Sequence, residues 1–367
     1  MKRFTLLLFM LTFSVNALRA QSLIKEAMNS FASYGQSQKI ADLEKARKFI
    51  DDAYTTRRDS LGYRNNLTRA LIYSTLAVID SNRKYTYKKD PVEETEYCLG
   101  KLRSQKFLAE HEPEISFIRK QLAEAYLLRA NKALSDSRFY EALTEYKKVY
   151  RLSEGESDVI HNLAVLSERL NFKEDAVQYY EELIEKKEAG PEYYLTVADL
   201  YTELNDPVKM QSTLQRGHRR FPQNRDILFK LLNTYTDQQD YQAIVTIIND
   251  AINLDPDNVN LNYLAGFAHE MTGNRSRAET YYKKTLELDP NSYEGNYALG
   301  LLYLNSYFRN TKKDEQMFLA KEYLTKANEI NSNDVKGLRA LVVLYKETGD
   351  MLQLQKLNNK LNELILN

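Results

Sequence analysis

The chain has 367 residues, of which 43% are hydrophobic, with only 12 Gly, 7 Pro and no Trp. This composition argues against a disordered chain and is typical of a long helical protein with an extended core. The 51 basic and 51 acidic residues balance, and no dense Lys/Arg block occurs. The sequence therefore lacks the basic face that binding to nucleic-acid phosphates requires, and we predict no nucleic-acid partner.

Residues 1–20 are predicted to be a signal peptide and not part of the fold. Lys2 and Arg3 form a positive start, residues 4–15 an apolar stretch, and residues 17–20 (ALRA) a small-residue exit. The apolar stretch is shorter than the roughly 20 residues that span a bilayer. We expect a bacterial protein exported to the periplasm, the outer membrane or the medium, with no membrane span after cleavage. An uncleaved membrane anchor is the alternative.

Cys98 is the only cysteine of the chain. A single cysteine excludes an intramolecular disulfide and a metal site built from several cysteines. It also lies far from the predicted cleavage site, so no cysteine is available there to accept a lipid.

Residues 21–122 are expected to form a degenerate helical-repeat region. The stretch 43–54 has apolar residues at helical spacing, as the second helix of a repeat would. The strongly apolar stretch 67–79 would pack as the next first helix, and helix would resume over 93–102 after a turn-prone stretch at 81–91. That loop, rich in Lys and Arg, is either a solvated excursion or a contact loop.

Three prolines in the second half share one frame. Pro222, Pro256 and Pro290 lie 34 residues apart, and each follows a helix-like stretch. Proline sits naturally just past a helix end, so a helical stop recurs every 34 residues. Counted in this frame, repeats begin at Ala123, Ser157, Pro191, Arg225, Val259, Tyr293 and Val335.

Small and bulky residues recur within the frame. Small residues fall where paired helices must approach closely, at Ala164, Ala198, Gly266 and Gly300. Bulky aromatic residues fall where they would fill the space between neighbouring turns. We predict a structural role for these tyrosines: Tyr146, Tyr180, Tyr201, Tyr235, Tyr282 and Tyr303.

This pattern resembles the tetratricopeptide repeat (TPR) family over residues 123–367, and more weakly from about Ile40. The resemblance implies an all-α, right-handed superhelical solenoid of stacked helix-turn-helix repeats, about seven of them in the regular array. It also implies a concave groove, lined by the first helix of each repeat, that binds an extended peptide or a partner's helix.

One repeat departs from the period. After Tyr293 the alanine due at position 312 appears only at Ala320, so residues 306–318 contain an insertion. We expect a lengthened turn between the two helices, which solenoids tolerate. An insertion that contacts the partner is the alternative.

Groove residues follow from the frame, in which place 1 is the first residue of each repeat. Places 5 and 9 of the middle repeats give the candidate partner-binding residues: Leu195, Asp199, Phe229, Asn233, Tyr263, Phe267, Tyr297 and Leu301. Residues four apart share a helix face, so the last four would form an aromatic-aliphatic ladder. Acidic residues flank it at Glu192, Asp226, Glu270 and Glu294. The prediction is a groove for an apolar segment with nearby basic residues; packing of these side chains against the repeats' own core is the alternative.

No catalytic constellation is visible in the sequence. The four histidines have no His-Glu-x-x-His spacing, and neither a Gly-x-Ser-x-Gly motif nor a phosphate-binding Gly-rich loop occurs. We predict that the protein is not an enzyme and has no catalytic, cofactor-binding or metal-binding residues.

The preferred function is a protein-interaction scaffold of the cell envelope that binds a protein or peptide partner; its identity and the oligomeric state are left open. The alternative is a glycan- or peptidoglycan-binding module, because a Tyr-rich groove could also stack on sugar rings. A hydrolase hidden in the irregular region 22–113 is a third possibility.

Overall fold

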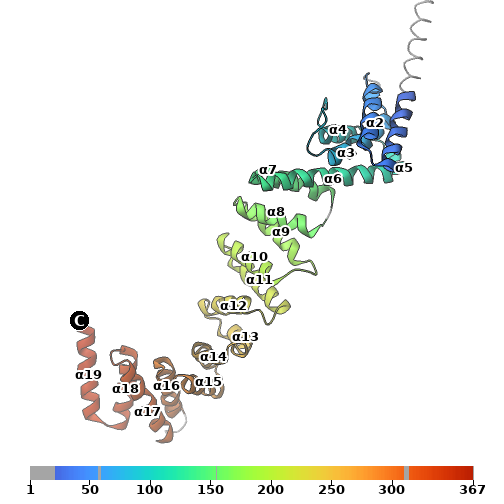
Figure 1. Cartoon of the computed structure of the whole chain (residues 1–367). Helices are drawn as coiled ribbons and strands as arrows, with labels where there is room; N and C mark the ends of the chain where they lie inside the picture. The colour runs from blue at the N-terminus through green and yellow to red at the C-terminus, as the bar shows by residue number, and fades with distance from the viewer. Residues whose placement is uncertain (1–20, 57–58, 154, 310–313, 367) are drawn as a thin grey trace, which may run out of the picture. The chain divides into compact units, whose positions relative to one another are not determined.

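The computed structural model describes residues 21–56, 59–153, 155–309 and 314–366 (Figure 1). Over these ranges the chain is helical and contains no strand, so the predicted all-α solenoid is confirmed as a fold class. The chain divides into two compact units between Ala189 and Gly190. The signal-peptide prediction for residues 1–20 lies outside the described residues.

The first unit begins with a helix over residues 21–37 that pairs with α2 (Ile40–Asp52) in a common core. A short 3-10 turn at Asp59–Leu61 leads into a second pair. The remaining helices of the unit are α3 (Tyr63–Ile79), α4 (Pro91–Lys101), α5 (Gln105–Glu110), α6 (Glu112–Ser135), α7 (Phe139–Leu152), α8 (Ser157–Arg169) and α9 (Lys173–Ile184).

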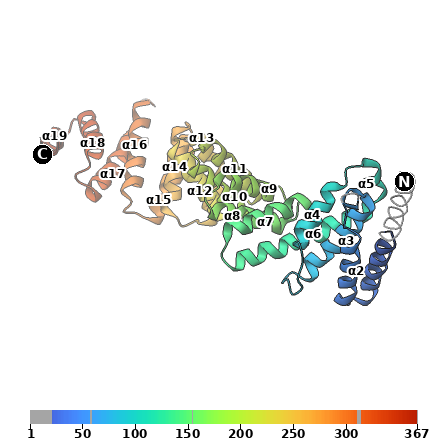
Figure 2. The same cartoon turned by 90° about the horizontal axis from the view of Figure 1, so that it is seen from above.

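The second unit consists of helices that pair in sequence as antiparallel hairpins (Figure 2). Each hairpin has a first helix with an even number and a second helix with an odd number. They are α10 (Pro191–Glu203), α11 (Pro207–Arg220), α12 (Arg225–Asp237), α13 (Tyr241–Leu254), α14 (Val259–Met271), α15 (Arg275–Leu288), α16 (Tyr293–Arg309), α17 (Asp314–Ile330), α18 (Val335–Thr348) and α19 (Met351–Leu366).

The 34-residue period is visible in the backbone itself. In five successive hairpins, from α6–α7 to α14–α15, the turn contains one residue with positive φ. These residues follow one another at intervals of 34: Ser137, Asn171, Asn205, Gln239 and Gly273. The residue after each of them donates its amide to a carbonyl five residues back, as Phe172 does to Ser167 at 2.8 Å. The first helix of each of these five hairpins is thus closed in the same way, by a left-handed residue after which an amide satisfies one of the helix's last carbonyls.

The repeat positions pack as the sequence predicts. Pro222, Pro256 and Pro290 each lie two residues beyond the end of a second helix. A Cβ added at Gly266 would lie 2.5 Å from Cδ1 of Tyr282, and one at Gly300 would lie 2.7 Å from Cγ of Leu324. The small residues therefore allow close approach, as expected. The tyrosines predicted to be structural are all buried: Tyr146, Tyr180, Tyr201, Tyr235, Tyr282 and Tyr303.

In the first unit, α3 is buried on all sides and α6 is longer than the helices that follow it. The apolar stretch 67–79 lies within α3, whose residues from Asn66 to Ala77 are buried around the whole helix. α6 has 24 residues, against 13 in α8. Its first half supplies Ile115 and Ile118 to a core shared with α3 and α4. The extra length of α6 therefore joins the irregular N-terminal region to the first regular hairpin.

The loop before α4 is fastened by one buried carboxylate. Asp80, 3% exposed, accepts hydrogen bonds from the amides of Lys84 at 2.8 Å and Tyr85 at 3.0 Å, and from the hydroxyl of Tyr87 at 2.7 Å. Arg83 ties the loop's other end by an ion pair with Asp90 at 3.0 Å. The loop is therefore an ordered element of the first unit.

The insertion in the irregular repeat lengthens helices. α16 and α17 each have 17 residues, against 13 in α14 and 14 in α15. The expected longer turn is therefore wrong for most of 306–318, because helix continues to Arg309 and resumes at Asp314; positions 310–313 lie outside the described residues. The extended hairpin end exposes Phe308 and Phe318.

Among the helices that the structure describes, none has both the length and the apolar character needed to cross a membrane.

Candidate partner-binding surface

Several successive first helices of the second unit contact each other. α10 contacts α12, α14 contacts α16, and α16 contacts α18. Tyr293 at the start of α16 donates its hydroxyl to Asp334 just before α18 at 2.6 Å, which links two successive first helices. We call the surface formed by places 2, 5, 9 and 12 of α10, α12, α14, α16 and α18 the first-helix face.

The predicted ladder is an aromatic cluster that is packed on one side. The rings of Tyr263 and Phe267 are stacked, with centroids 6.3 Å apart and an interplanar angle of 18°. Tyr263 also lies 5.9 Å from the ring of Tyr282, and Phe267 meets Tyr241 edge-on at 5.4 Å. Tyr263 and Phe267 are half-buried and pack against the core. Each ring therefore packs against the core with one side, and only its other side is available to a partner.

The next repeat extends the cluster. Tyr297 stacks on Tyr293 with centroids 5.8 Å apart and an interplanar angle of 7°, and Leu301 is half-buried beside it. Burial and the neighbouring Asp334 raise the pKa of Tyr297. Burial, followed by the charges of Glu294 and Glu270, raises the pKa of Tyr263. Both phenols therefore stay neutral at physiological pH.

The N-terminal end of the first-helix face is more polar. Leu195 and Phe229 are half-buried, and Asn233 is exposed. Asp199 is exposed but forms an ion pair with Lys230 of the next first helix. Arg225 lies over the ring of Phe229 at 5.1 Å. The pairing of Asp199 could not be read from places 5 and 9, because Lys230 stands at place 6.

The acidic flank is only partly free. Glu192, Asp226 and Glu294 are exposed. Glu270 is half-buried and accepts a hydrogen bond from the hydroxyl of Tyr282 at 2.8 Å. Glu270 therefore helps to hold its own hairpin, and the exposed negative charge comes from the other three.

The sequence-based list of groove residues stopped before the last first helix. In α18 the same four places hold Lys336, Arg339, Val343 and Lys346, and all four are exposed. Arg339 and Lys346 form no ion pair with any residue that the structure describes. We call these four residues the basic end of the first-helix face. The repeat frame from Val335 contained the signal for them.

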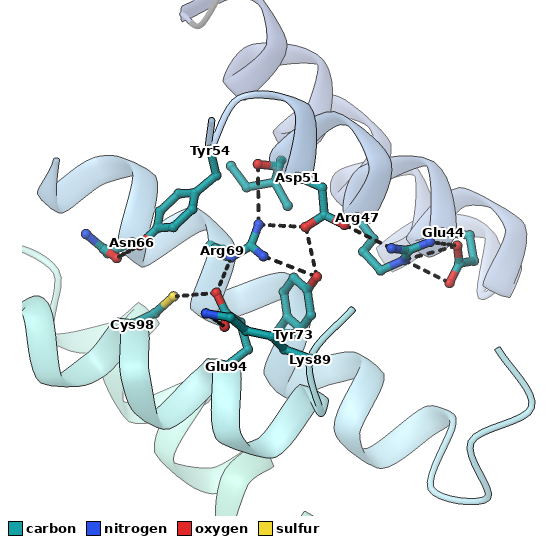
Figure 3. Close-up of polar contacts among 11 residues, drawn as sticks. Glu44, Arg47, Asp51, Tyr54, Asn66, Arg69, Tyr73, Lys89, Glu94 and Cys98 are labelled. Atoms are coloured by element: carbon teal, nitrogen blue, oxygen red, sulfur yellow. Dashed lines mark hydrogen bonds and ion pairs between the residues drawn. The ribbon is translucent and has the colours of Figure 1, made fainter. Parts of the chain in front are cut away.

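The first unit contains a buried ionic cluster that the sequence did not indicate (Figure 3). Nε of Arg69 on α3 lies 2.6 Å from Oε1 of Glu94 on α4, and Nη1 of Arg69 lies 2.7 Å from Oδ1 of Asp51 on α2. Tyr73 donates its hydroxyl to the same Asp51 oxygen at 2.8 Å. Arg47 holds the second Asp51 oxygen at 2.9 Å. The cluster thus joins three helices.

This cluster has a structural role and contains no activated group. Burial opposes the charge of Arg69, but Tyr73, Glu94 and Asp51 more than offset it, so that its pKa is raised. Burial, followed by the charge of Glu94, raises the pKa of the Cys98 thiol to about 12. A thiol with this pKa is not a nucleophile at neutral pH. The arrangement therefore clamps helices together and offers no activated group.

Within the described ranges, no group of three or more His, Cys, Asp or Glu side chains is placed to hold a metal ion.

Comparison with known proteins gives likenesses of fold. A family model described as the MAP3K TRAFs-binding domain matches residues 200–367, less than half of the chain. The C-terminal part of a TPR repeat-containing protein from Cytophaga hutchinsonii is 16% identical, with a TM-score of 0.42, over 64% of this chain and 93% of that one. YrrB, described as a TPR protein with an unusual peptide-binding site, is 16% identical, with a TM-score of 0.33, over 53% and 95%.

MamA from Desulfovibrio magneticus RS-1 is 16% identical to this chain, with a TM-score of 0.34, over 50% of this chain and 99% of that one. No curated protein matches the sequence. The hairpins of this chain have a 34-residue period, a recurrent left-handed turn and close contacts at small residues. These features show that the chain has the fold of a tetratricopeptide-repeat protein.

Proposed function

We propose that this chain is a non-enzymatic protein-interaction scaffold of the bacterial cell envelope. Its partner is an extended peptide or a helix that lies across the first-helix face of the second unit. The observation that supports this best is the row of half-buried Tyr263, Phe267, Tyr297 and Leu301 on neighbouring first helices. Stacked, core-supported rings lose little conformational entropy on binding, which suits them as anchors for a partner.

The surroundings of this row favour a basic partner segment. Glu192 on α10, Asp226 on α12 and Glu294 on α16 are exposed and are not engaged in ion pairs with other described residues. Acidic side chains at the rim of an apolar row attract basic residues and speed association, without adding much affinity for each pair. The proposal therefore combines apolar anchors with a basic flank in the partner.

Export is the second part of the proposal and rests on the sequence of residues 1–20. A positively charged n-region, an apolar h-region and a cleavage site with small residues follow one another in the order typical of a signal peptide. Cell fractionation with an antibody tests this part: we expect a mature chain in the envelope or medium that is shorter than the precursor. A full-length chain in the cytoplasm would contradict it.

A cross-linked pull-down from envelope fractions tests the binding proposal. The variant that blocks the surface is Asn233→Arg with Asn260→Arg, since both asparagines are exposed on first helices beside the aromatic row. The matched control is Gln242→Arg with Ser276→Arg, at exposed positions of second helices. Both variants add the same charge and leave the buried sides of the rings intact.

We expect the parent and the control to recover the same partner and the first-helix variant to lose it. Equal recovery of the partner by all three proteins would show that the interface lies outside the first-helix face. Recovery of protease-resistant polysaccharide in place of a protein would favour the glycan-binding alternative.

A further inference from the structure

The first-helix face carries acidic residues from α10 to α16 and basic residues only on α18. At places 2, 5, 9 and 12, the helices from α10 to α16 carry acidic residues and no basic one: Glu192, Asp199, Asp226, Glu270 and Glu294. At the same places, α18 carries Lys336, Arg339 and Lys346 and no acidic residue. The sign of the charge therefore reverses between two helices that contact each other, α16 and α18.

The cations of the basic end form no ion pair with any other residue that the structure describes. Arg339 and Lys346 are exposed and unpaired, and Lys336 lies near Asp334, whose carboxylate is already held by Tyr293 at 2.6 Å and the amide of Gly337 at 2.6 Å. No ion pair joins Lys336 to Glu294 across the two helices. Val343, 46% exposed, lies among these cations. The basic end is thus a free cationic surface with one apolar contact.

The apolar row lies on the first helices that precede this basic end. Tyr297 and Leu301 are on α16, which contacts α18, and Tyr263 and Phe267 are on α14, which contacts α16. Neighbouring packed helices lie about 8–10 Å apart, so the five first helices extend over roughly 40 Å. An extended chain of about a dozen residues covers this distance, at about 3.3 Å per residue. A single short segment can therefore meet the acidic part, the apolar row and the basic end together.

We infer that the first-helix face binds its partner in one fixed orientation, through a segment with a basic end, an apolar middle and an acidic end. The acidic side chains lie over Lys336, Arg339 and Lys346 on α18, and the basic end lies over Glu192 and Asp226. Reversing the segment would bring like charges together at both ends, which opposes the wrong orientation. This inference rests on the proposed binding function and adds the partner's charge order.

A display library of random peptides about 16 residues long tests the inference, since this length exceeds the dozen or so residues needed to cover the face. The peptides are fused at both ends, so that only side chains present carboxylates. Selection is run on three forms of the full chain. They are the parent, the charge reversal Lys336→Glu/Arg339→Glu/Lys346→Glu, and a control with the same total charge, Lys321→Glu/Lys326→Glu/Lys356→Glu, at exposed positions of second helices.

On the parent and the control we expect enrichment of peptides with an acidic end, an apolar middle and a basic end. On the reversed α18 variant the acidic end should disappear from the selected peptides. A bipolar peptide selected on the parent should bind the reversed variant roughly 10- to 100-fold more weakly. This difference should shrink at about 0.5 M salt, because screening weakens exposed charge pairs.

The outcomes separate the two claims. Apolar peptides without an acidic end on the parent, or the same acidic end on the reversed variant, would leave peptide binding intact and overturn the orientation. Absence of any enrichment on the parent would contradict the proposed binding function and this inference with it.

Discussion

Arg69 on α3 and Glu94 on α4 form an ion pair with a 2.6 Å Nε–Oε1 distance, in which Glu94 is only 1% exposed. The same guanidinium binds Asp51 of α2, so one side chain neutralises two carboxylates from two different helices. Without Arg69, the ion pairs left to these carboxylates among the described residues would be that of Glu94 with Lys89, at 3.1 Å, and that of Asp51 with Arg47, at 2.9 Å. A buried charge that loses a partner is costly. The first unit therefore depends on Arg69 for the assembly of its first helices.

Replacing Arg69 by Met keeps most of the side-chain volume and removes the charge. We expect the free energy of unfolding to fall by up to about 3–5 kcal/mol, because Glu94 and Asp51 lose their shared partner. Urea unfolding followed by circular dichroism measures the change. The control is Arg138→Met, which removes exposed ion pairs with Glu141 and Asp136 and should leave the free energy of unfolding nearly unchanged. Equal losses in both variants would refute the role given to the cluster.

Gly266 is predicted to tolerate no side chain, because an added Cβ would lie 2.5 Å from Cδ1 of buried Tyr282. The substitution Gly266→Ala should destabilise the second unit by about 1–3 kcal/mol through overpacking. Gly100→Ala supplies the contrast, since that helical glycine has no neighbour within 4 Å of the added Cβ. It should be neutral or stabilise by up to about 1 kcal/mol. Thermal unfolding of the two variants checks whether only Gly266→Ala lowers stability.

His269 gives the second unit a pH dependence. The imidazole is 1% exposed, stacks on Tyr281 with centroids 5.5 Å apart, and neither of its nitrogens has a hydrogen-bond partner among the described residues. Burial, followed by the charge of Arg277, lowers its pKa. The unfolded chain, with a histidine pKa near 6.5, therefore takes up the proton at a higher pH than the folded chain does. The stability due to neutral His269 is complete above that pH and is lost as the pH falls below it.

The variant His269→Phe removes this titration. Between pH 7.5 and 5, the parent should lose more free energy of unfolding than the variant, by at most about 1.4 kcal/mol for each pH unit. Urea unfolding of both proteins at a series of pH values gives the difference directly. Parallel curves for the two proteins would show that His269 does not titrate in this range.

Asp80 is predicted to hold the loop over residues 81–90 in its observed form. Burial works against its charge, but the hydrogen bonds from the amide of Tyr85, the hydroxyl of Tyr87 and the amide of Lys84 lower its pKa. In Asp80→Ala these three donors lose their acceptor, so the amides of Lys84 and Tyr85 should exchange with deuterium roughly 5- to 150-fold faster, given about 1–3 kcal/mol for an unsatisfied group. Exchange measured by mass spectrometry tests this. Unchanged exchange at both amides would mean that the loop is held by other contacts.

The repeat architecture could be predicted from the sequence because each of its signals is local. Proline after a helix, Gly266 opposite Tyr282 and the recurring aromatic places all act within one hairpin or between neighbours, so spacing alone reveals them. The helix extension at 306–318 could not be predicted, since a polar stretch with several charged residues suits an exposed helix as well as a turn. Helix continues to Arg309 past Leu304, the last buried residue of α16, and the partly buried Tyr307 in this extension packs against the core.

The candidate site was predictable in position but not in detail. The repeat frame identified Tyr263, Phe267, Tyr297 and Leu301 on first helices, yet their half-buried state depends on Tyr241 and Tyr282 from second helices. The pairing of Asp199 with Lys230 depends on the register between two hairpins. The buried ionic cluster of the first unit was missed for the same reason, because its members look like solvated charges within each separate helix.

Hydrogen–deuterium exchange of the full chain, with and without the partner recovered by pull-down, tests the central claim most directly. We expect the partner to slow exchange in the first helices α12, α14, α16 and α18, and to leave exchange in the second helices α13, α15 and α17 unchanged. Protection confined to the second helices, or to the first unit, would contradict binding at the first-helix face.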